Sequence, residues 1–218
     1  MKTLSEIVAD ATFVTLLGAG ECAKADLFAA IELAPTLVCA DGGADTAFDL
    51  GLKPTAIVGD LDSLDLARAT GADVPVIELA DQNFSDFDKA LMGLSRQFVL
   101  AVGFLGGRFD HQLTALTALS RAHGPVVLIG SEDVICSIPR EIEINVPAGT
   151  RISLWPIVES SGHSTGLRWP IDGLTLSPQG RIGTSNAAEG PVKIEVTSGE
   201  LLLILPRDCL TELVAALS

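Results

Sequence analysis

Several short runs of glycine and acidic residues in the first half of the chain contain the residue types that bind divalent cations and phosphate groups. The densest is Gly59-Asp60-Leu61-Asp62-Ser63. In an extended backbone, side chains two positions apart point to the same side, so Asp60 and Asp62 can reach one ligand. Converging carboxylates repel one another unless a cation lies between them, and Mg²⁺ prefers oxygen ligands. This run therefore predicts a divalent-cation site.

A second acidic run, Asp81-Gln82-Asn83-Phe84-Ser85-Asp86, precedes an apolar helical pattern. Ser85 and Asp88 have the spacing of a capping box, so we expect Asp88 to cap the helix. Asp86, at the first helical position, can instead point toward Asp60 and Asp62. Lys89, one turn further on, faces either phosphate or solvent.

Two glycine pairs follow the apolar strands at 36–40 and 98–105. Gly42-Gly43, directly after Asp41, allows a backbone to approach a ligand closely, although a tight strand-to-helix turn explains it equally well. Gly106-Gly107 precedes Arg108 at an expected helix start, where a helix N-terminus and a guanidinium both favour anions. These positions are candidates for phosphate binding.

The second half contains one small polar segment, Gly183-Thr184-Ser185-Asn186, between two strand-like runs. We expect a turn or a ligand-binding loop there. The tryptophans Trp155 and Trp169 are more typical of packing than of ligand platforms.

The elements that position these residues follow from the hydrophobic pattern. Through about residue 130, short apolar runs alternate with helical spacing, which predicts a parallel sheet with helices on both faces and a ligand crevice at the carboxyl ends of its strands. Beyond residue 130, short alternating runs separated by turn signals predict an antiparallel β-sandwich. The expected fold is therefore a Rossmann-like α/β domain over residues 1–133, followed by an all-β sandwich domain over 134–218.

Composition excludes several classes of protein. The 218 residues contain 14 Lys plus Arg and 28 Asp plus Glu, a formal net charge of −14, which disfavours binding to nucleic acid. The four cysteines lack zinc-site spacing. The sequence shows no apolar run long enough for a membrane span and no secretory signal, so we expect a cytoplasmic protein without membrane partners.

These residues leave three classes of function open. One is a Mg²⁺-dependent phosphoryl or pyrophosphoryl transferase. Another is a nicotinamide-dinucleotide oxidoreductase, since Gly18-x-Gly20-x-x-Ala23 follows a strand and Asp41 lies about 20 residues on. That alternative leaves the remaining aspartates and Arg108 unexplained. The third is a non-catalytic nucleotide-binding module.

Five of these motifs, taken in order, resemble the thiamine pyrophosphokinase family. They are Ala40-Asp41-Gly42-Gly43-Ala44, Gly59-Asp60-Leu61-Asp62-Ser63, Asp81-Gln82-Asn83-Phe84-Ser85-Asp86, Gly106-Gly107-Arg108-Phe109-Asp110-His111 and Thr184-Ser185-Asn186. The resemblance extends from Gly18 to about Leu205. It implies a homodimeric enzyme that transfers the pyrophosphoryl group of ATP to the hydroxyl of thiamine, giving thiamine diphosphate and AMP.

The resemblance also implies roles for individual residues. Asp60, Asp62 and Asp86 match Mg²⁺-binding carboxylates, and together with Arg108 and Asp110 they form the expected catalytic set. Asp86 and Asp110 are both candidates for the general base. Ala187-Ala188 stands where the family commonly has an aromatic residue, so Trp169 is a possible stacking partner for thiamine. The expected substrate-binding residues are Asp41, Gly42, Gly43, Ser63, Lys89, Gly107, Arg108, Thr184, Ser185 and Asn186.

Overall fold

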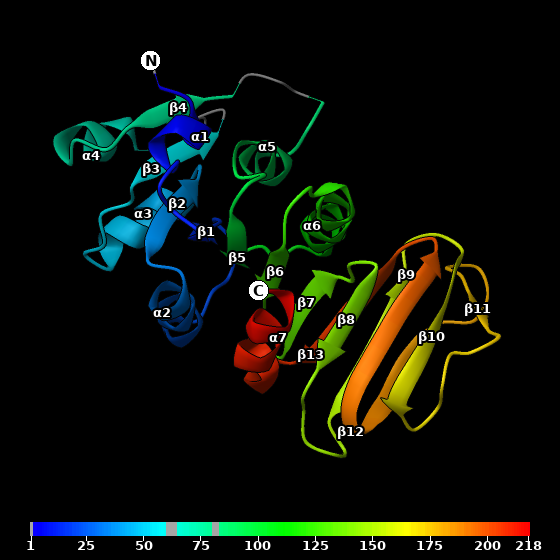
Figure 1. Ribbon diagram of the computed structural model, residues 1–218. Helices are drawn as coiled ribbons and strands as arrows, with labels where there is room; N and C mark the ends of the chain where they lie inside the picture. The colour runs from blue at the N-terminus through cyan, green and yellow to red at the C-terminus, as the bar shows by residue number, and fades with distance from the viewer. Residues whose placement is uncertain (1, 60–64, 80–82) are drawn as a thin grey trace. The chain divides into compact units, whose positions relative to one another are not determined.

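The computed structural model describes residues 2–59, 65–79 and 83–218, and the chain divides into two compact units, 1–131 and 132–218 (Figure 1). The predictions made for Asp60, Asp62, Ser63 and Asp81 lie outside the described residues. Among the described helices, none has the length and apolar character that a membrane crossing requires.

The first unit is built on a parallel sheet with the strand order β6-β5-β1-β2-β3-β4. Its strands are β1 (Phe13–Leu17), β2 (Thr36–Ala40), β3 (Ala56–Gly59), β4 (Val76–Glu78), β5 (Phe98–Val102) and β6 (Val126–Ile129). Most strand residues are buried, as expected for parallel strands that helices cover on both faces. The chain runs from β1 outward to β4 and returns beside β1 as β5. That reversal of strand order places a crevice at the carboxyl ends of β1 and β5.

Helices connect these strands. They are α1 (Leu4–Ile7), α2 (Lys24–Leu33), α3 (Gly43–Asp49), α4 (Leu66–Gly71), α5 (Asp86–Gly93) and α6 (Phe109–Arg121). Helix α6 packs through Ala115, Ala118 and Leu119, whereas Phe109 and Leu113 remain exposed. The spacing of Phe87, Leu91 and Leu94 predicts a helix over 85–97, but α5 ends at Gly93, in keeping with the low helix propensity of glycine.

The second unit contains antiparallel strands in the order β7-β13-β9-β12-β10-β11, and β8 also pairs with β12. The strands are β7 (Asp133–Ser137), β8 (Glu141–Ile144), β9 (Arg151–Pro156), β10 (Ser160–Leu167), β11 (Thr175–Leu176), β12 (Gly183–Ser198) and β13 (Leu201–Pro206). A short 3₁₀ turn (Arg207–Cys209) and α7 (Leu210–Leu217) complete the unit. The first residues of β12 pair with β9 and its later residues pair with β8 and β10, so β12 joins two parts of the unit.

Two expectations for this unit are wrong. The segment at 183–186 is not a turn between strands but the beginning of β12. The alternating pattern predicts strands at 142–146, 151–156, 174–176, 192–196 and 201–205, but not β10, whose residues, Ser-Ser-Gly-His-Ser-Thr-Gly-Leu, show no hydrophobic alternation. A Cβ at Gly162 would collide with the Glu195 carbonyl group on β12, and one at Gly166 with that of Pro191. Close approach to β12 therefore explains these glycines.

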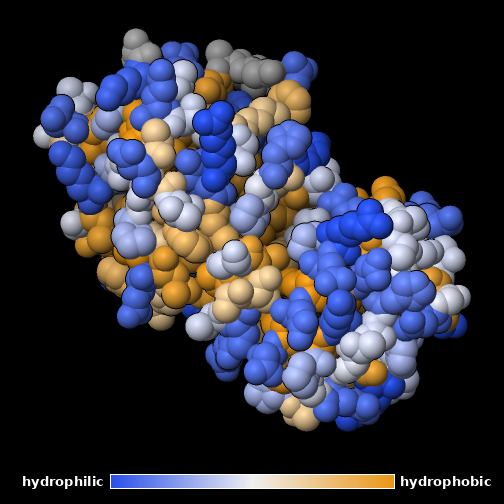
Figure 2. Space-filling model, in the orientation of Figure 1, coloured by the Kyte–Doolittle hydropathy of each residue, from blue (hydrophilic) through white to orange (hydrophobic). Residues whose placement is uncertain are grey.

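Both units expose a mixture of side chains. Hydrophobic and hydrophilic residues are interleaved on the visible face of each (Figure 2). The large exposed apolar side chains include Phe28, Met92 and Phe109 in the first unit and Val158 and Trp169 in the second. Scattered exposure of this kind is normal, so a site has to be located from geometry and chemistry.

Candidate functional site

The ends of β2 and β3 meet at Asp41. The Asp41 residue is 8% exposed and has a positive φ of 42°, which aspartate tolerates better than most residues. Its N–H donates to the Val58 carbonyl at 2.8 Å, and a Cβ built on Gly59 would lie 3.0 Å from the Asp41 Cβ. Gly59 directly precedes Asp60 in the chain. The predicted cation-binding run therefore starts beside Asp41.

Packing explains the second glycine of the pair after Asp41. Gly42 has an ordinary helical φ of −59°, and the left-handed conformation belongs to Asp41 instead. A Cβ at Gly43 would collide with the Leu17 carbonyl oxygen, so only glycine lets α3 begin this close to the end of β1. The tight strand-to-helix turn is thus the better explanation of Gly43.

Asp86 and Lys89 form an ion pair at the start of α5. The Lys89 ammonium lies 2.7 Å from Asp86 Oδ1, and it donates to the Leu79 carbonyl at 2.9 Å. The Lys89 side chain is only 7% exposed, whereas that of Asp86 is 31% exposed. Lys89 is therefore not a solvated charge. It fixes the orientation of Asp86, which stays accessible.

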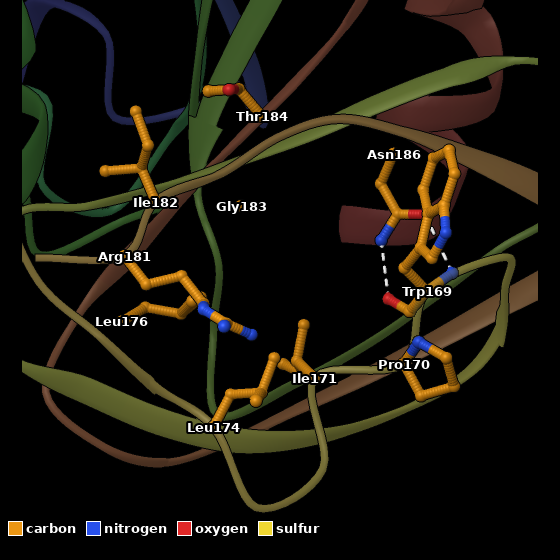
Figure 3. Close-up of a pocket in the computed structure, with 10 residues that line it drawn as sticks. All are labelled: Trp169, Pro170, Ile171, Leu174, Leu176, Arg181, Ile182, Gly183, Thr184 and Asn186. Carbon is orange, nitrogen blue, oxygen red and sulfur yellow. Dashed lines mark hydrogen bonds between the residues drawn. The ribbon is translucent and has the colours of Figure 1, made fainter.

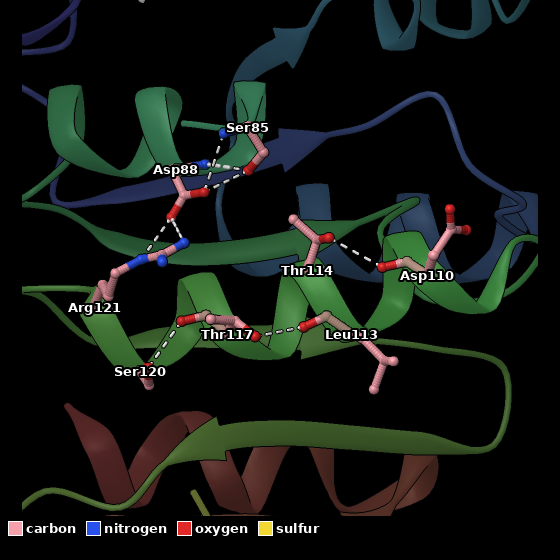
Figure 4. Close-up of polar contacts among 8 residues, drawn as sticks. All are labelled: Ser85, Asp88, Asp110, Leu113, Thr114, Thr117, Ser120 and Arg121. Carbon is pink, nitrogen blue, oxygen red and sulfur yellow. Dashed lines mark hydrogen bonds and ion pairs between the residues drawn. The ribbon is translucent and has the colours of Figure 1, made fainter. Parts of the chain in front are cut away.

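Asp88 links α5 to α6. Its carboxylate forms the expected capping box with Ser85, which confirms that prediction. The same carboxylate, 3% exposed, accepts from Arg121 Nη2 at 2.6 Å and from Arg121 Nε at 3.1 Å (Figure 4). The sequence analysis did not find this pair, since no local signal joins residues 33 positions apart.

Arg108 and Asp110, both predicted site residues, contact each other at the start of α6. Arg108 Nη2 donates to Asp110 Oδ2 at 2.6 Å and its Nε donates to Oδ1 at 3.1 Å. These hydrogen bonds lower the pKa of Asp110 and raise that of Arg108. Both side chains are largely exposed, so the pair presents a fixed positive group to solvent.

A metal site cannot be assembled from the described residues alone. Within the ranges 2–59, 65–79 and 83–218, no group of three or more His, Cys, Asp or Glu side chains is close enough to hold a metal ion. Asp86 is described, but Asp60 and Asp62 are not. The predicted three-carboxylate set therefore stays a prediction.

The second unit contains a cavity of about 280 Å³ beside Trp169 and Asn186 (Figure 3). Asn186 is buried, and its side-chain amide forms hydrogen bonds with both backbone groups of Trp169. Its Oδ1 accepts from the Trp169 N–H at 3.1 Å, and its Nδ2 donates to the Trp169 carbonyl at 2.7 Å. Trp169 itself is 57% exposed. Asn186 thus positions an accessible aromatic ring.

Thr184 and Ser185 lie at an irregular part of β12. The register with β9 shifts between Gly183 and Asn186, and Ser185 has a positive φ of 62°. Its N–H donates to the Ser153 hydroxyl at 3.0 Å, and Thr184 lines the cavity. Strand irregularities and left-handed non-glycine residues concentrate near binding sites.

Arg181 is a charged cavity residue that the sequence analysis did not identify as a candidate. Its side chain extends toward Ile171, and Leu174 and Leu176 belong to the apolar lining (Figure 3). The residue follows a turn signal, Pro178-Gln179-Gly180, which marks a loop but carries no indication that the next side chain enters a cavity.

Comparisons with known proteins match both units to the same protein family. The family model for the thiamin pyrophosphokinase catalytic domain matches residues 29–128, and that for the thiamin pyrophosphokinase vitamin B1 binding domain matches 137–201. Thiamine pyrophosphokinase 1 of Oryza sativa subsp. japonica is 31% identical over 203 residues, 76% of each chain. Thiamine pyrophosphokinase 2 of Arabidopsis thaliana is 32% identical over 208 residues, 78% of each chain.

Solved structures share the fold. Thiamine pyrophosphokinase from Bacillus subtilis superimposes with a TM-score of 0.72 at 24% identity, covering 89% of this chain and 99% of that one. The yeast enzyme superimposes with a TM-score of 0.75 at 19% identity, covering 96% of this chain and 92% of the other.

Proposed function

The chain belongs to the thiamine pyrophosphokinase family, and from that premise we propose how its residues transfer a pyrophosphoryl group from ATP to the hydroxyl of thiamine. The products are thiamine diphosphate and AMP, because the thiamine oxygen attacks the β-phosphorus and AMP leaves. The observation that carries this proposal is the order of the two family matches, catalytic over 29–128 and B1-binding over 137–201. The finer assignment is part of the proposal: a Rossmann-like domain over 1–133 binds ATP and a β-sandwich domain over 134–218 binds thiamine.

The donor chemistry at the carboxyl edge of the first sheet fits Mg²⁺. Asp60, Asp62 and Asp86 all supply carboxylate oxygens, the ligands that Mg²⁺ prefers beside substrate phosphates. Lys89 holds Asp86 in place, and the buried Asp41 adjoins Gly59 immediately before Asp60. When bound, Mg²⁺ neutralises the charge that develops on phosphoryl oxygens.

Arg108 supplies a second positive charge. Asp110 occupies Nε and Nη2 of the guanidinium, which leaves N–H groups on Nη1 available to phosphate oxygens. Because Asp110 fixes the plane of the guanidinium, the free donors are already oriented before ATP binds. Gly107, with a φ of 66°, brings the chain to Arg108 through a conformation that glycine adopts without strain.

Asp86 is the better candidate to accept the proton of the thiamine hydroxyl. Arg108 engages both carboxylate oxygens of Asp110 and lowers its pKa, which weakens it as a base, whereas Lys89 contacts Asp86 through Oδ1. Asp86 combines an accessible side chain with a fixed orientation. We therefore assign Asp110 to the orientation of Arg108.

Thiamine binds on the Trp169 side in this proposal. The accessible ring of Trp169, held through Asn186, offers an aromatic face for the flat and positively charged rings of thiamine. Thr184 and Ser185 supply the neighbouring polar groups. Following the family resemblance, we propose that the enzyme is a homodimer. The expectation of a cytoplasmic location stays a prediction.

The direct test is to incubate the purified protein with ATP, Mg²⁺ and thiamine and to separate the nucleotides by chromatography. We expect AMP to form one-for-one with thiamine diphosphate, and a chelator to abolish both. Formation of ADP would show attack on the γ-phosphorus and a different kinase. A complete lack of thiamine-dependent turnover, in protein shown by circular dichroism to be folded, would overturn the assignment.

A further inference from the structure

The loop that carries Trp169 comprises residues 168–174 and joins β10 to β11. Besides Trp169, this loop contributes Pro170, Ile171 and Leu174 to the lining of the cavity in the second unit (Figure 3). The two hydrogen bonds from the Asn186 amide hold the loop at Trp169 alone. The course of the loop beyond Trp169, and with it one wall of the cavity, therefore depends on other groups.

Asp172 attaches the middle of this loop to β10. Its Oδ2 accepts from the Ser164 N–H at 3.2 Å, and its Oδ1 lies 2.9 Å from His163 Nδ1. Ser164 forms a reciprocal hydrogen bond, because its hydroxyl accepts from the Ile171 N–H at 3.0 Å. Strand β11 pairs with β10 at residues 160 and 161, so at 163 and 164 the loop side chain and a serine hydroxyl stand in place of a strand ladder.

The contacts with Ser164 are sheltered from water, whereas the contact with His163 is exposed. Ser164 is 8% exposed and Ile171 is 3% exposed, but the side chains of His163 and Asp172 are 62% and 50% exposed. The hydrogen bonds from His163 and from the Ser164 N–H lower the pKa of Asp172, so its carboxylate is an acceptor at neutral pH. Because a sheltered N–H is costly to leave unpaired, the bond from Ser164 should contribute most to holding the loop.

We propose that Asp172 is a positioning residue for thiamine binding, an inference that rests on the proposed function. Asp172 is not among the described residues that line the cavity, so its effect on thiamine passes through its neighbours. It holds Ile171 in the cavity wall and fixes the loop on the far side of Pro170 from Trp169. Proline restricts the backbone between these two attachments, so a displacement at Asp172 is transmitted to the Trp169 ring.

The first test compares Asp172→Ala with the conservative Asp172→Asn in the full-length protein. Alanine removes both acceptors, whereas asparagine keeps an oxygen for the Ser164 N–H and an amide that can donate to His163 Nδ1. We expect Asp172→Ala to raise the KM for thiamine about fivefold to tenfold, with kcat and the KM for ATP within about twofold of the wild-type values. Asp172→Asn should restore most of the affinity. Asp208→Ala, at an exposed aspartate outside the loop, is the matched control.

Trp169 provides a second readout that does not require catalysis. The chain contains two tryptophans, so Trp155→Phe leaves Trp169 as the single tryptophan emitter. In that background, time-resolved fluorescence anisotropy reports local motion of the ring on the nanosecond timescale. We expect Asp172→Ala to lower the residual anisotropy of Trp169, and Asp172→Asn to leave it close to that of the parent protein. Thermal unfolding of each variant shows whether it is folded.

An unchanged KM for thiamine in folded Asp172→Ala protein that forms thiamine diphosphate would overturn the inference and leave the proposed function intact. A lower kcat at an unchanged KM would overturn it as well, since a residue that positions the binding site acts on KM. If Asp172→Ala does not fold, Ser164→Ala removes the hydrogen bond to the Ile171 N–H and should raise the KM for thiamine in the same way.

A wild-type protein that forms no thiamine diphosphate would reject the proposed function separately. Titration of Trp169 fluorescence with thiamine would then decide the inference. Quenching by thiamine that needs a higher thiamine concentration in Asp172→Ala than in the parent protein would support it. A fluorescence signal that does not respond to thiamine in either protein would overturn it.

Discussion

The two units hold their candidate site residues in different ways. In the first unit charged side chains are held by charged partners: Asp86 by Lys89, Asp88 by Arg121, and Asp110 by Arg108. In the second unit the candidate residues Asn186 and Ser185 are held by neutral hydrogen bonds, Asn186 to the Trp169 backbone and Ser185 to the Ser153 hydroxyl.

The difference follows from the substrates proposed for each unit. Phosphate groups and a metal ion require charged residues, and a charged residue close to the protein interior needs an opposite charge or strong hydrogen bonds. An aromatic ring requires only a fixed position, which neutral hydrogen bonds supply. We expect substitutions in the first unit to affect catalysis and stability strongly, and those in the second to affect mainly the affinity for thiamine.

The largest effect should come from Asp86→Asn. It removes the negative charge proposed for cation binding and proton acceptance, and we expect kcat for thiamine diphosphate formation to fall about 10²- to 10⁴-fold. Steady-state kinetics at saturating Mg²⁺ measures this. Asp49→Asn, a largely exposed aspartate of α3, is the control and should retain full kcat. A kcat within twofold of the wild-type value in Asp86→Asn would refute the catalytic role of Asp86.

The next largest effect should be a loss of folding stability when Arg121 is replaced. Arg121→Gln leaves the Asp88 carboxylate without its cationic partner, and because Arg121 is itself 47% exposed we expect a loss of about 1–3 kcal/mol in the free energy of unfolding. Urea denaturation measures it, with Arg96→Gln as the exposed control. In a double-mutant cycle with Asp88→Asn, the two losses should be clearly less than additive. Strict additivity would mean that the ion pair contributes nothing.

Asn186→Ala tests whether the neutral hydrogen bonds of Asn186 position Trp169 in the second unit. The variant loses the hydrogen bonds to both backbone groups of Trp169, so the ring is held less firmly, and we expect the KM for thiamine to rise about tenfold with little change in kcat. Asn145→Ala, at an exposed asparagine, is the control. If Asn186→Ala lowered kcat and left the KM unchanged, Asn186 would have a role in the chemical step instead.

The smallest effect concerns the titration of Asp110. Arg108 lowers the pKa of this carboxyl group, so Arg108→Gln should raise that pKa toward its ordinary value of 3.8. A carboxyl group whose pKa is lower in the folded state than in the unfolded state stabilises the fold at pH values above its unfolded-state pKa. That contribution to stability is lost as the pH falls through the pKa of Asp110 in the folded state, which lies below 3.8. Carbon-detected NMR titration of Asp110 in both proteins measures the change, and an unaltered pKa would show that the pair is absent in solution.

Local patterns predicted much of this structure. The apolar runs located the buried parallel strands, because strands covered on both faces read as continuous hydrophobic segments. Ser85 and Asp88 identified a helix start from three-residue spacing alone. Strand β10 escaped prediction because its glycines are explained only by close contact with β12, a partner distant in sequence.

The sequence by itself determined which family the order of the motifs resembles, and it predicted which residues bind phosphate or a cation. Only the tertiary structure decided what each side chain contacts. Lys89 could have faced phosphate or solvent, and its burial against Asp86 and the Leu79 carbonyl made it a positioning residue. Likewise, the side-chain amide of Asn186 forms hydrogen bonds with the Trp169 backbone, which makes Asn186 a positioning residue as well. The physical reason is that hydrogen bonds and ion pairs depend on distances between atoms, and folding sets those distances for residues that lie far apart in the chain.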